Sequence, residues 1–106
     1  MTTLAQEGLL AGVVLLGAPD AGLSDDLKEL QNQSATGPLV IAVDEEGGVV
    51  QRLEGLLGFM VSAQQQATGT PEEARALAQQ RAEALTALGF TMNLAPVIDV
   101  GGGPGI

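Results

Sequence analysis

The sequence has 106 residues, 45% of them hydrophobic and only two aromatic, which suffices for one domain with a modest aliphatic core and argues against disorder throughout. Thirteen acidic residues against four basic ones give a net charge of -9, which excludes the electrostatic attraction on which nucleic-acid binding depends. Cysteine and histidine are absent, so disulfides, thiolate nucleophiles and imidazole bases are excluded, and any chemistry must use carboxylates, hydroxyls or arginine.

The first apolar stretch, Leu9 to Gly17, is far shorter than the roughly 20 residues that span a bilayer. A signal peptide would carry positive charge before such a stretch, but no basic residue precedes it and Glu7 occupies that place. We therefore expect a cytoplasmic protein without a membrane partner, unless an export signal precedes this sequence.

Three continuous apolar runs predict strands over residues 11–16, 39–43 and 90–97, the last of which includes Asn93 and Pro96. Continuous runs are typical of parallel strands that are buried on both faces because helices cover the sheet. The sequence therefore favours a parallel sheet.

A first helix is predicted between the first two strands. Ser24 is its candidate N-cap, and Asp25 and Asp26 lie in the first turn, where carboxylates complement the helix dipole. We expect this helix to end before Gly37-Pro38.

A second helix is predicted before the third strand, and its signals are clearer. Thr70 and Glu73 form a capping box, and Pro71 occupies the first helical position. Gly89 follows the last apolar residue as a C-cap. One face of this helix carries the apolar residues Ala74, Leu77, Ala78, Leu85 and Leu88 at helical spacing.

The predicted order of strand, helix, strand, long loop, helix and strand gives two βαβ units with right-handed crossovers. We therefore expect an α/β fold with a parallel sheet of about three strands and two crossover helices, in one unit over residues 1–106. Three strands cannot close a barrel, and their open edges leave backbone groups unpaired. We therefore expect either that a partner chain, such as another copy of this chain, supplies further strands or that the sequence is a fragment. Residues 101–106 are expected to form a flexible tail.

Two of the predicted strands end in an aspartate, Asp44 and Asp99. Functional residues in parallel α/β folds lie beyond the carboxyl ends of the strands, so both are candidate site residues. If the two strands are neighbours, the Cα atoms lie within roughly 5 to 10 Å of each other. Aspartate also ends strands because it caps turns, so spacing alone does not establish a site.

The segment after the second predicted strand combines three carboxylates, Asp44, Glu45 and Glu46, with a glycine pair and Arg52. The glycines at 47–48 permit positive φ and a close backbone approach to a ligand. Arg52 offers a planar donor fork to a ligand oxygen, or it neutralises the acidic cluster. Three carboxylates would repel phosphate, and a divalent cation is an alternative ligand, although consecutive positions seldom converge on one ion.

The run IAVDEEGGVVQRL resembles the VDQEGGRVQRL segment of family-3 glycoside hydrolases, and LGFTMNLAPVIDV resembles their later strand, which typically reads GVNLNFAPVVDV. The earlier AGVVLLG is similar to their GGVILFGRN strand, and the loop and helix between these motifs also match. The resemblance covers residues 8–100 in the right order. It implies part of a (β/α)8 barrel, or TIM barrel, of the β-N-acetylglucosaminidase (beta-hexosaminidase) kind, which acts in carbohydrate or peptidoglycan metabolism.

The resemblance also implies roles for single residues. Asp44 matches the aspartate that accepts hydrogen bonds from sugar hydroxyls, and Arg52 matches a second substrate contact, so the expected partner is an N-acetylglucosamine-type glycoside. Asp99 and Glu46 are candidate supporting residues. We expect neither a metal nor a cofactor.

Two departures bear on activity. Val49 replaces the arginine that usually follows the glycine pair, and Met60-Val61-Ser62 lacks a proline that is usual in the family. The family's lysine-histidine segment, acid/base loop and nucleophilic aspartate have no match in this sequence, and the first barrel strand has none either. A retaining glycosidase needs both groups, so we expect this chain alone to be inactive. The alternative is a non-catalytic module that binds sugar or self-associates as a half-barrel.

Overall fold

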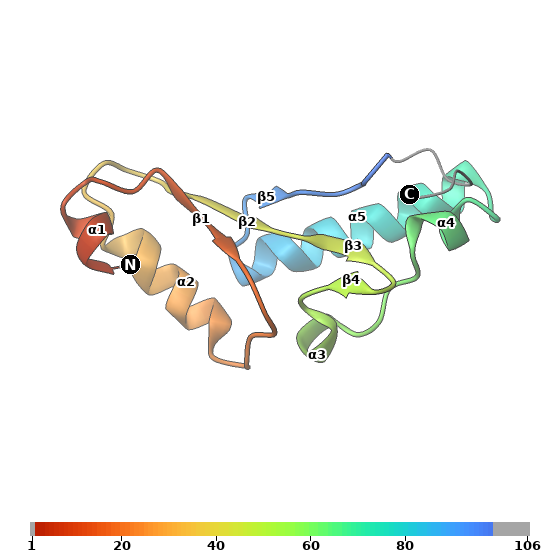
Figure 1. Cartoon of the computed structure of the whole chain (residues 1–106), viewed down its shortest axis with the longest axis horizontal. Helices are drawn as coiled ribbons and strands as arrows, with labels where there is room; N and C mark the ends of the chain where they lie inside the picture. Colours follow the sequence, from red (N-terminus) through yellow and green to blue (C-terminus); the bar gives the residue numbers. More distant parts are fainter. Residues whose placement is uncertain (1, 99–106) are drawn as a thin grey trace, which may run out of the picture.

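The computed structural model describes residues 2–98 of the chain. Its main sheet has three parallel strands in the order β1 (Gly12–Leu15), β2 (Val40–Val43) and β5 (Met92–Asn93). Helix α2 (Leu23–Asn32) connects β1 to β2, and helix α5 (Pro71–Leu88) leads into β5 (Figure 1). The predicted α/β fold with about three parallel strands and two crossover helices is confirmed.

The segment between β2 and α5 contains more structure than the long loop that the sequence predicted. A two-stranded antiparallel hairpin follows β2 directly, and two one-turn helices follow the hairpin. A further short helix precedes β1. These elements are β3 (Glu45–Gly47), β4 (Val50–Gln51), α3 (Glu54–Leu57), α4 (Ala63–Gln66) and α1 (Thr2–Gln6).

The core lies between the main sheet and helices α2 and α5. Ile41 and Val43 of β2 are fully buried on the face that these helices cover, and the registers pair them with Val13 and Leu15 of β1. The residues of the core cluster are Ala5, Leu23, Leu27, Leu30, Leu39, Ile41, Val43, Leu53, Leu85 and Phe90. Each fully buried leucine, isoleucine, valine or phenylalanine of this cluster contributes about 1.5–3 kcal/mol when its side chain is removed from water.

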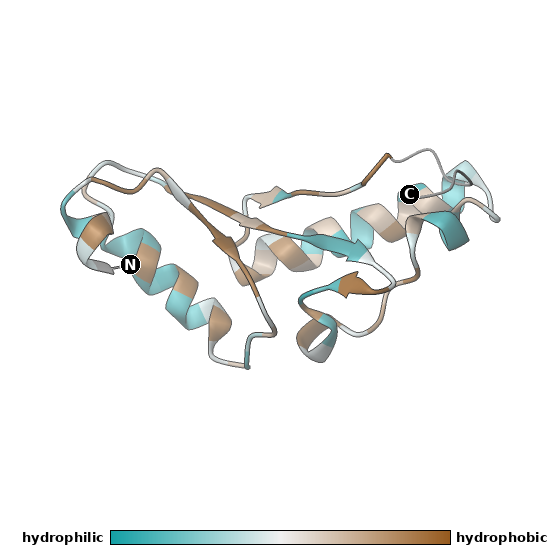
Figure 2. Cartoon of the chain, viewed as in Figure 1, coloured by the Kyte–Doolittle hydropathy of each residue, from teal (hydrophilic) through white to brown (hydrophobic). Residues whose placement is uncertain are grey.

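The opposite face of the sheet is only partly covered. On this face Ala42 of β2 is buried, but Val40 of β2 is 44% exposed, Val14 of β1 is 52% exposed and Met92 of β5 is 47% exposed. The prediction that the strands are buried on both faces is therefore wrong for β1 and β5, and for the first residue of β2. Figure 2 shows the apolar character of β1 and the hydrophilic character of β3, which continues from β2.

Helix α2 begins one residue before the predicted N-cap. Leu23 is its first residue and Gly22 its N-cap, so the prediction that Ser24 caps this helix is wrong. The Asp20 carboxylate accepts a hydrogen bond from the Gly22 N–H at 2.8 Å, which closes a turn just before the helix. Asp25 and Asp26 lie in the first turn as predicted.

Helix α5 has the predicted bounds. The Thr70 hydroxyl accepts a hydrogen bond from the Glu73 N–H at 3.1 Å, and the Glu73 carboxylate accepts one from the Thr70 N–H at 2.8 Å. Gly89 ends the helix with φ of 111°, where a side chain would be strained. This turn directs the chain into Phe90, which is buried in the core.

The third predicted strand, residues 90–97, is ordered as a strand only at Met92–Asn93, because β5 pairs with β2 alone in the described part of the chain. Asp99 and the predicted tail at 101–106 lie outside the residues that the structure describes. None of the helices within 2–98 is long and apolar enough to cross a bilayer.

Candidate functional site

The candidate site lies at the carboxyl end of β2, where the β3–β4 hairpin begins. Asp44 follows the last residue of β2, and Arg52 follows the last residue of β4. The hairpin pairs Glu45 with Gln51, so the chain folds back and brings the two predicted residues together. The Arg52 guanidinium lies 3.9 Å from the Asp44 carboxylate.

This pair is accessible to a ligand. The Asp44 side chain is 28% exposed and the Arg52 side chain is 35% exposed, so both retain open surface. The buried Nε of Arg52 has no hydrogen-bond partner among the described residues. A carboxylate that accepts hydrogen bonds beside a guanidinium that donates them can bind the hydroxyl groups of a polyol.

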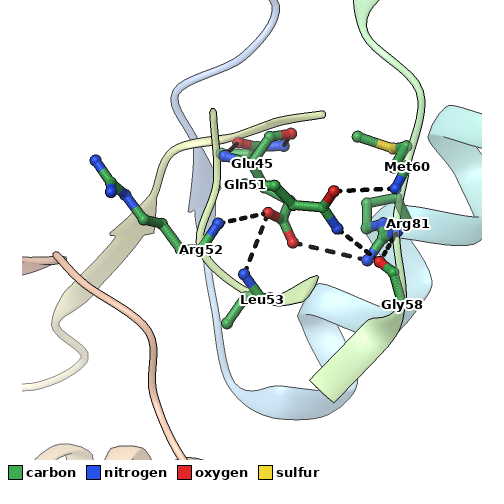
Figure 3. Close-up of polar contacts among 8 residues, drawn as sticks. Glu45, Gln51, Arg52, Leu53, Gly58, Met60 and Arg81 are labelled. Carbon is green, nitrogen blue, oxygen red and sulfur yellow. Dashed lines mark hydrogen bonds and ion pairs between the residues drawn. The ribbon is translucent and has the colours of Figure 1, made fainter. Parts of the chain in front are cut away.

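Glu45 has a different environment, although it is the next residue after Asp44. It is 1% exposed, and its Oε1 accepts hydrogen bonds from the backbone N–H groups of Arg52 at 3.0 Å and Leu53 at 3.4 Å (Figure 3). Its Oε2 lies 3.6 Å from the guanidinium of Arg81, which is also buried. The three consecutive carboxylates therefore do not form one acidic cluster.

Arg81 reaches this position from helix α5 and was not predicted as a site residue. Its Nη2 donates a hydrogen bond to the Gly58 carbonyl at 3.1 Å. The sequence held one signal, because Arg81 lies four residues from both Leu77 and Leu85 and so interrupts the predicted apolar face. A charge at such a position requires a buried partner, and Glu45 provides it.

Gln51 connects the same loop to the hairpin. Its side-chain amide donates a hydrogen bond to the Gly58 carbonyl at 2.6 Å and accepts one from the Met60 N–H at 3.0 Å. The loop after α3 is thus held by Gln51 from the hairpin and by Arg81 from α5.

Burial is the main influence on the Glu45 carboxyl and raises its pKa. The hydrogen bond from the Leu53 N–H, the charge of Arg81 and the hydrogen bond from the Arg52 N–H all favour the ionised form and oppose this rise, but burial outweighs them. Glu45 is therefore harder to ionise than an exposed glutamate.

The glycine pair adopts the positive φ that the sequence predicted, and another segment of the chain packs closely against it. Gly47 and Gly48 have φ of 88° and 62°, and they form a tight turn against the segment that follows α3. A Cβ at Gly47 would lie 2.4 Å from the Val61 carbonyl oxygen, and the Gly48 N–H donates a hydrogen bond to the Met60 carbonyl at 2.8 Å. The pair is therefore needed for packing of the loop against the hairpin.

Asn93 of β5 fixes the start of the hairpin and was also missed as a site residue. Its side-chain oxygen accepts a hydrogen bond from the Glu45 N–H at 3.1 Å, and its side-chain nitrogen donates one to the Glu45 carbonyl at 3.3 Å.

Glu46 lies beside a groove of about 310 Å³ between the hairpin, α5 and the segment after β5. Glu46 is only partly buried, and within residues 2–98 it forms no hydrogen bond or ion pair with Asp44 or Arg52.

The alternative of a cation held by Asp44, Glu45 and Glu46 finds no support. Among residues 2–98, no group of three acidic side chains is arranged to hold a metal ion. The Glu45 carboxylate is instead occupied by Arg81 and two backbone N–H groups.

The sequence is similar to a known protein family and to named members of it. Residues 6–105 match the family described as glycosyl hydrolase family 3 N terminal domain. The chain is 39% identical over 97 residues to the beta-hexosaminidase LpqI of Mycobacterium tuberculosis, with 88% of this chain and 25% of that protein covered. It is 36% identical over 109 residues to a beta-hexosaminidase of Xanthomonas euvesicatoria, with 92% of this chain and 32% of that protein covered.

Solved structures are similar over the same region. A crystal structure of a glycosyl hydrolase of the GH3 family from Mycobacterium smegmatis superposes with a TM-score of 0.83 at 35% identity, covering 93% of this chain and 31% of that one. The structure of LpqI from M. tuberculosis gives a TM-score of 0.82 at 34% identity, covering 97% of this chain and 32% of that one. The chain thus spans about a quarter to a third of the length of these relatives.

Proposed function

The chain belongs to glycosyl hydrolase family 3, and from this premise we propose that it is a sugar-binding segment of a glycoside hydrolase that acts on N-acetylglucosamine-type glycosides. The similar proteins named beta-hexosaminidases support this class of substrate. A cytoplasmic location remains a prediction from the sequence.

The observation that carries the proposal is the Asp44–Arg52 pair. It lies at the carboxyl end of the central strand of a parallel sheet, which is where α/β folds bind their ligands. Asp44 accepts hydrogen bonds from two sugar hydroxyls, and Arg52 donates to a neighbouring oxygen. A site built for these hydroxyls rejects analogues that lack them, because its polar groups would then be left unpaired.

In this proposal the segment contributes binding but not bond cleavage. Retaining glycosidases use two carboxyl groups about 5–5.5 Å apart, one as nucleophile and one as acid/base. Glu45 is unsuited to either role, because its carboxylate is buried and occupied by Arg81 and two N–H groups. Glu46 and Asp99 are proposed as supporting residues only. The 106-residue chain is therefore inactive by itself.

The strand order supports a place in a barrel. Strands β1, β2 and β5 are neighbours in chain order, as in a (β/α)8 barrel, whereas a doubly wound sheet reverses its order at a switch point. Exposed apolar side chains on the second face of the sheet, such as Val14 and Met92, are suited to a barrel interior. Residues 1–106 are accordingly proposed as one segment of such a barrel domain.

Titration of the purified chain with N-acetylglucosamine, followed by ¹⁵N NMR, tests the binding role. We expect saturable shifts around Asp44 and Arg52 that disappear in Asp44→Ala and persist in the control Glu7→Gln, which alters an exposed carboxylate after α1. A response that is identical in Asp44→Ala would contradict the assignment.

A second experiment tests the expected lack of activity. The purified chain should show no turnover of a chromogenic N-acetylglucosaminide above that of buffer, and clear turnover would overturn the claim of inactivity.

A second candidate is a self-associating half-barrel. Within residues 2–98, β1 and β5 each pair on one side only, so both edges of the main sheet can accept another strand. Light scattering over a range of concentrations tests this idea, and a strictly monomeric mass at the highest concentration would remove it.

A further inference from the structure

We propose that Glu45 is the positioning residue of the sugar-contact pair: its carboxylate holds the Arg52 backbone so that the guanidinium lies beside Asp44, and Arg81 holds that carboxylate in turn. This inference rests on the proposed function, because it concerns how the same pair is kept ready to bind.

The first step of the argument concerns backbone hydrogen bonds. The ladder between β3 and β4 ends at Gln51, so the N–H groups of Arg52 and Leu53 need acceptors elsewhere. Leu53 is fully buried, which removes water as an alternative for its N–H. Both N–H groups donate to one oxygen of Glu45, at 3.0 and 3.4 Å. An ionised acceptor forms stronger hydrogen bonds than a neutral one, so the carboxylate suits this position.

The second step concerns what holds the carboxylate. Its other oxygen lies 3.6 Å from Arg81, and the same guanidinium donates to the Gly58 carbonyl at 3.1 Å. Arg81 is carried by α5, an 18-residue helix with a complete capping box. The hairpin is therefore tied to α5, the longest helix within residues 2–98, through one buried ion pair (Figure 3).

The third step concerns the direction of the side chains. Successive side chains of an extended segment point to opposite faces, so Asp44 is partly exposed while Glu45 is buried. Figure 3 shows the Arg52 side chain directed away from the Glu45 carboxylate that binds its backbone. Arg52 is thus held at two points, by Glu45 at the backbone and by Asp44 at the guanidinium.

Binding measurements on matched variants test the inference. Glu45→Met removes both oxygens but leaves Arg81 buried without a partner, so the double variant Glu45→Met/Arg81→Met replaces the whole pair with apolar side chains. We expect the folded double variant to lose affinity for N-acetylglucosamine by about tenfold. The single variant Glu45→Gln keeps an oxygen that can accept from both N–H groups. Its affinity for N-acetylglucosamine should therefore stay within about threefold of the wild-type value.

A spectroscopic measurement keeps the test independent of variant folding and of sugar binding. In the wild-type chain, the ¹H shifts of the Arg52 and Leu53 amides should move together with pH as Glu45 ionises, and this titration should be absent in Glu45→Gln. Among the described residues, the charged group that faces the Glu45 carboxylate is Arg81 on α5, because Arg52 contacts it only through its backbone N–H. The titration is expected above the usual range for glutamate, because burial raises the Glu45 pKa.

The two proposals fail in different ways. A folded double variant that binds sugar as tightly as the wild type would overturn the positioning role, and so would wild-type Arg52 and Leu53 amides that do not titrate together. If the wild-type chain gives no saturable response to sugar while the two amides titrate together, the sugar-binding function fails and the hold of Glu45 on the Arg52 backbone stands.

Discussion

Two ion pairs lie at the end of β2, and the contrast between them explains how this segment combines a fold with a ligand site. The Asp44–Arg52 pair is open, with about a third of each side chain exposed and 3.9 Å between the charged groups. The Glu45–Arg81 pair is sealed, with 0% and 10% of the side chains exposed and a separation of 3.6 Å. One backbone step separates an accessible carboxylate from a buried one.

The difference follows from solvation. A pair open to water gains little from its own attraction, so it contributes little to folding and remains available to a ligand. A buried pair loses the hydration of both charges, and it persists only because each partner compensates the other. We therefore expect changes to the sealed pair to affect stability and changes to the open pair to affect binding.

The largest effect is expected from Arg81→Met, which removes the cation and leaves Glu45 buried without compensation. We expect a loss of about 3–5 kcal/mol in the free energy of unfolding, measured by urea denaturation. Arg75→Met is a matched control, because Arg75 is an exposed residue of the same helix, and its change should stay within about 0.5 kcal/mol. Equal effects of the two substitutions would contradict the importance of the buried pair.

Gly47→Ala tests the turn of the β3–β4 hairpin, which lies between Glu45 of the sealed pair and Arg52 of the open pair. Gly47 has φ of 88°, and a Cβ there would lie 2.4 Å from the Val61 carbonyl oxygen. We expect a loss of about 2–3 kcal/mol in stability together with loss of sugar binding, because the hairpin must shift. Gly55→Ala is the control: nothing lies within 4 Å of its Cβ, and inside α3 it should stabilise the chain by about 0.5–1 kcal/mol.

The sequence predicts best those elements whose signals are local. The bounds of α5 were predictable because each end has its own local signal: Thr70, Pro71 and Glu73 specify the start, and Gly89 specifies the end. The start of α2 was not, because Gly22 and Ser24 are both acceptable caps and the Asp20 turn determines which one is used. The length of β5 depends on which strands pair with it in the sheet, and the residues of β5 alone do not specify that pairing.

The candidate site shows the same limit. Asp44 and Arg52 were predicted from a motif, and the structure brings them together, although their role in sugar binding remains a proposal. The partnership of Glu45 with Arg81 joins residues from the hairpin and from α5, so neither sequence neighbourhood specifies it. Glu45 lay in the predicted acidic cluster, and only its burial separates it from Asp44 and Glu46.

The pH dependence of stability sharpens the contrast at Glu45. Its folded-state pKa is raised above the ordinary value of 4.5 by burial, so between these two values the folded chain binds more protons than the unfolded chain. The resulting cost in stability is absent below the ordinary value, grows as pH rises through this window and is complete above the folded pKa. Urea unfolding across the window should show the wild type losing stability relative to Glu45→Gln as pH rises. Parallel curves, or the opposite slope, would contradict the raised pKa.

The smallest effect on stability is expected from Asp44→Asn, which breaks the open pair while keeping the shape of the side chain. Because both partners are partly exposed, the free energy of unfolding should fall by no more than about 1 kcal/mol, and less at high salt. Sugar binding should nevertheless be weakened, since the amide replaces one acceptor oxygen with an NH₂ donor and loses the charge that strengthens hydrogen bonds from sugar hydroxyls. A loss of stability as large as that of Arg81→Met would show that the open pair also supports the fold, and the distinction between the two pairs would then fail.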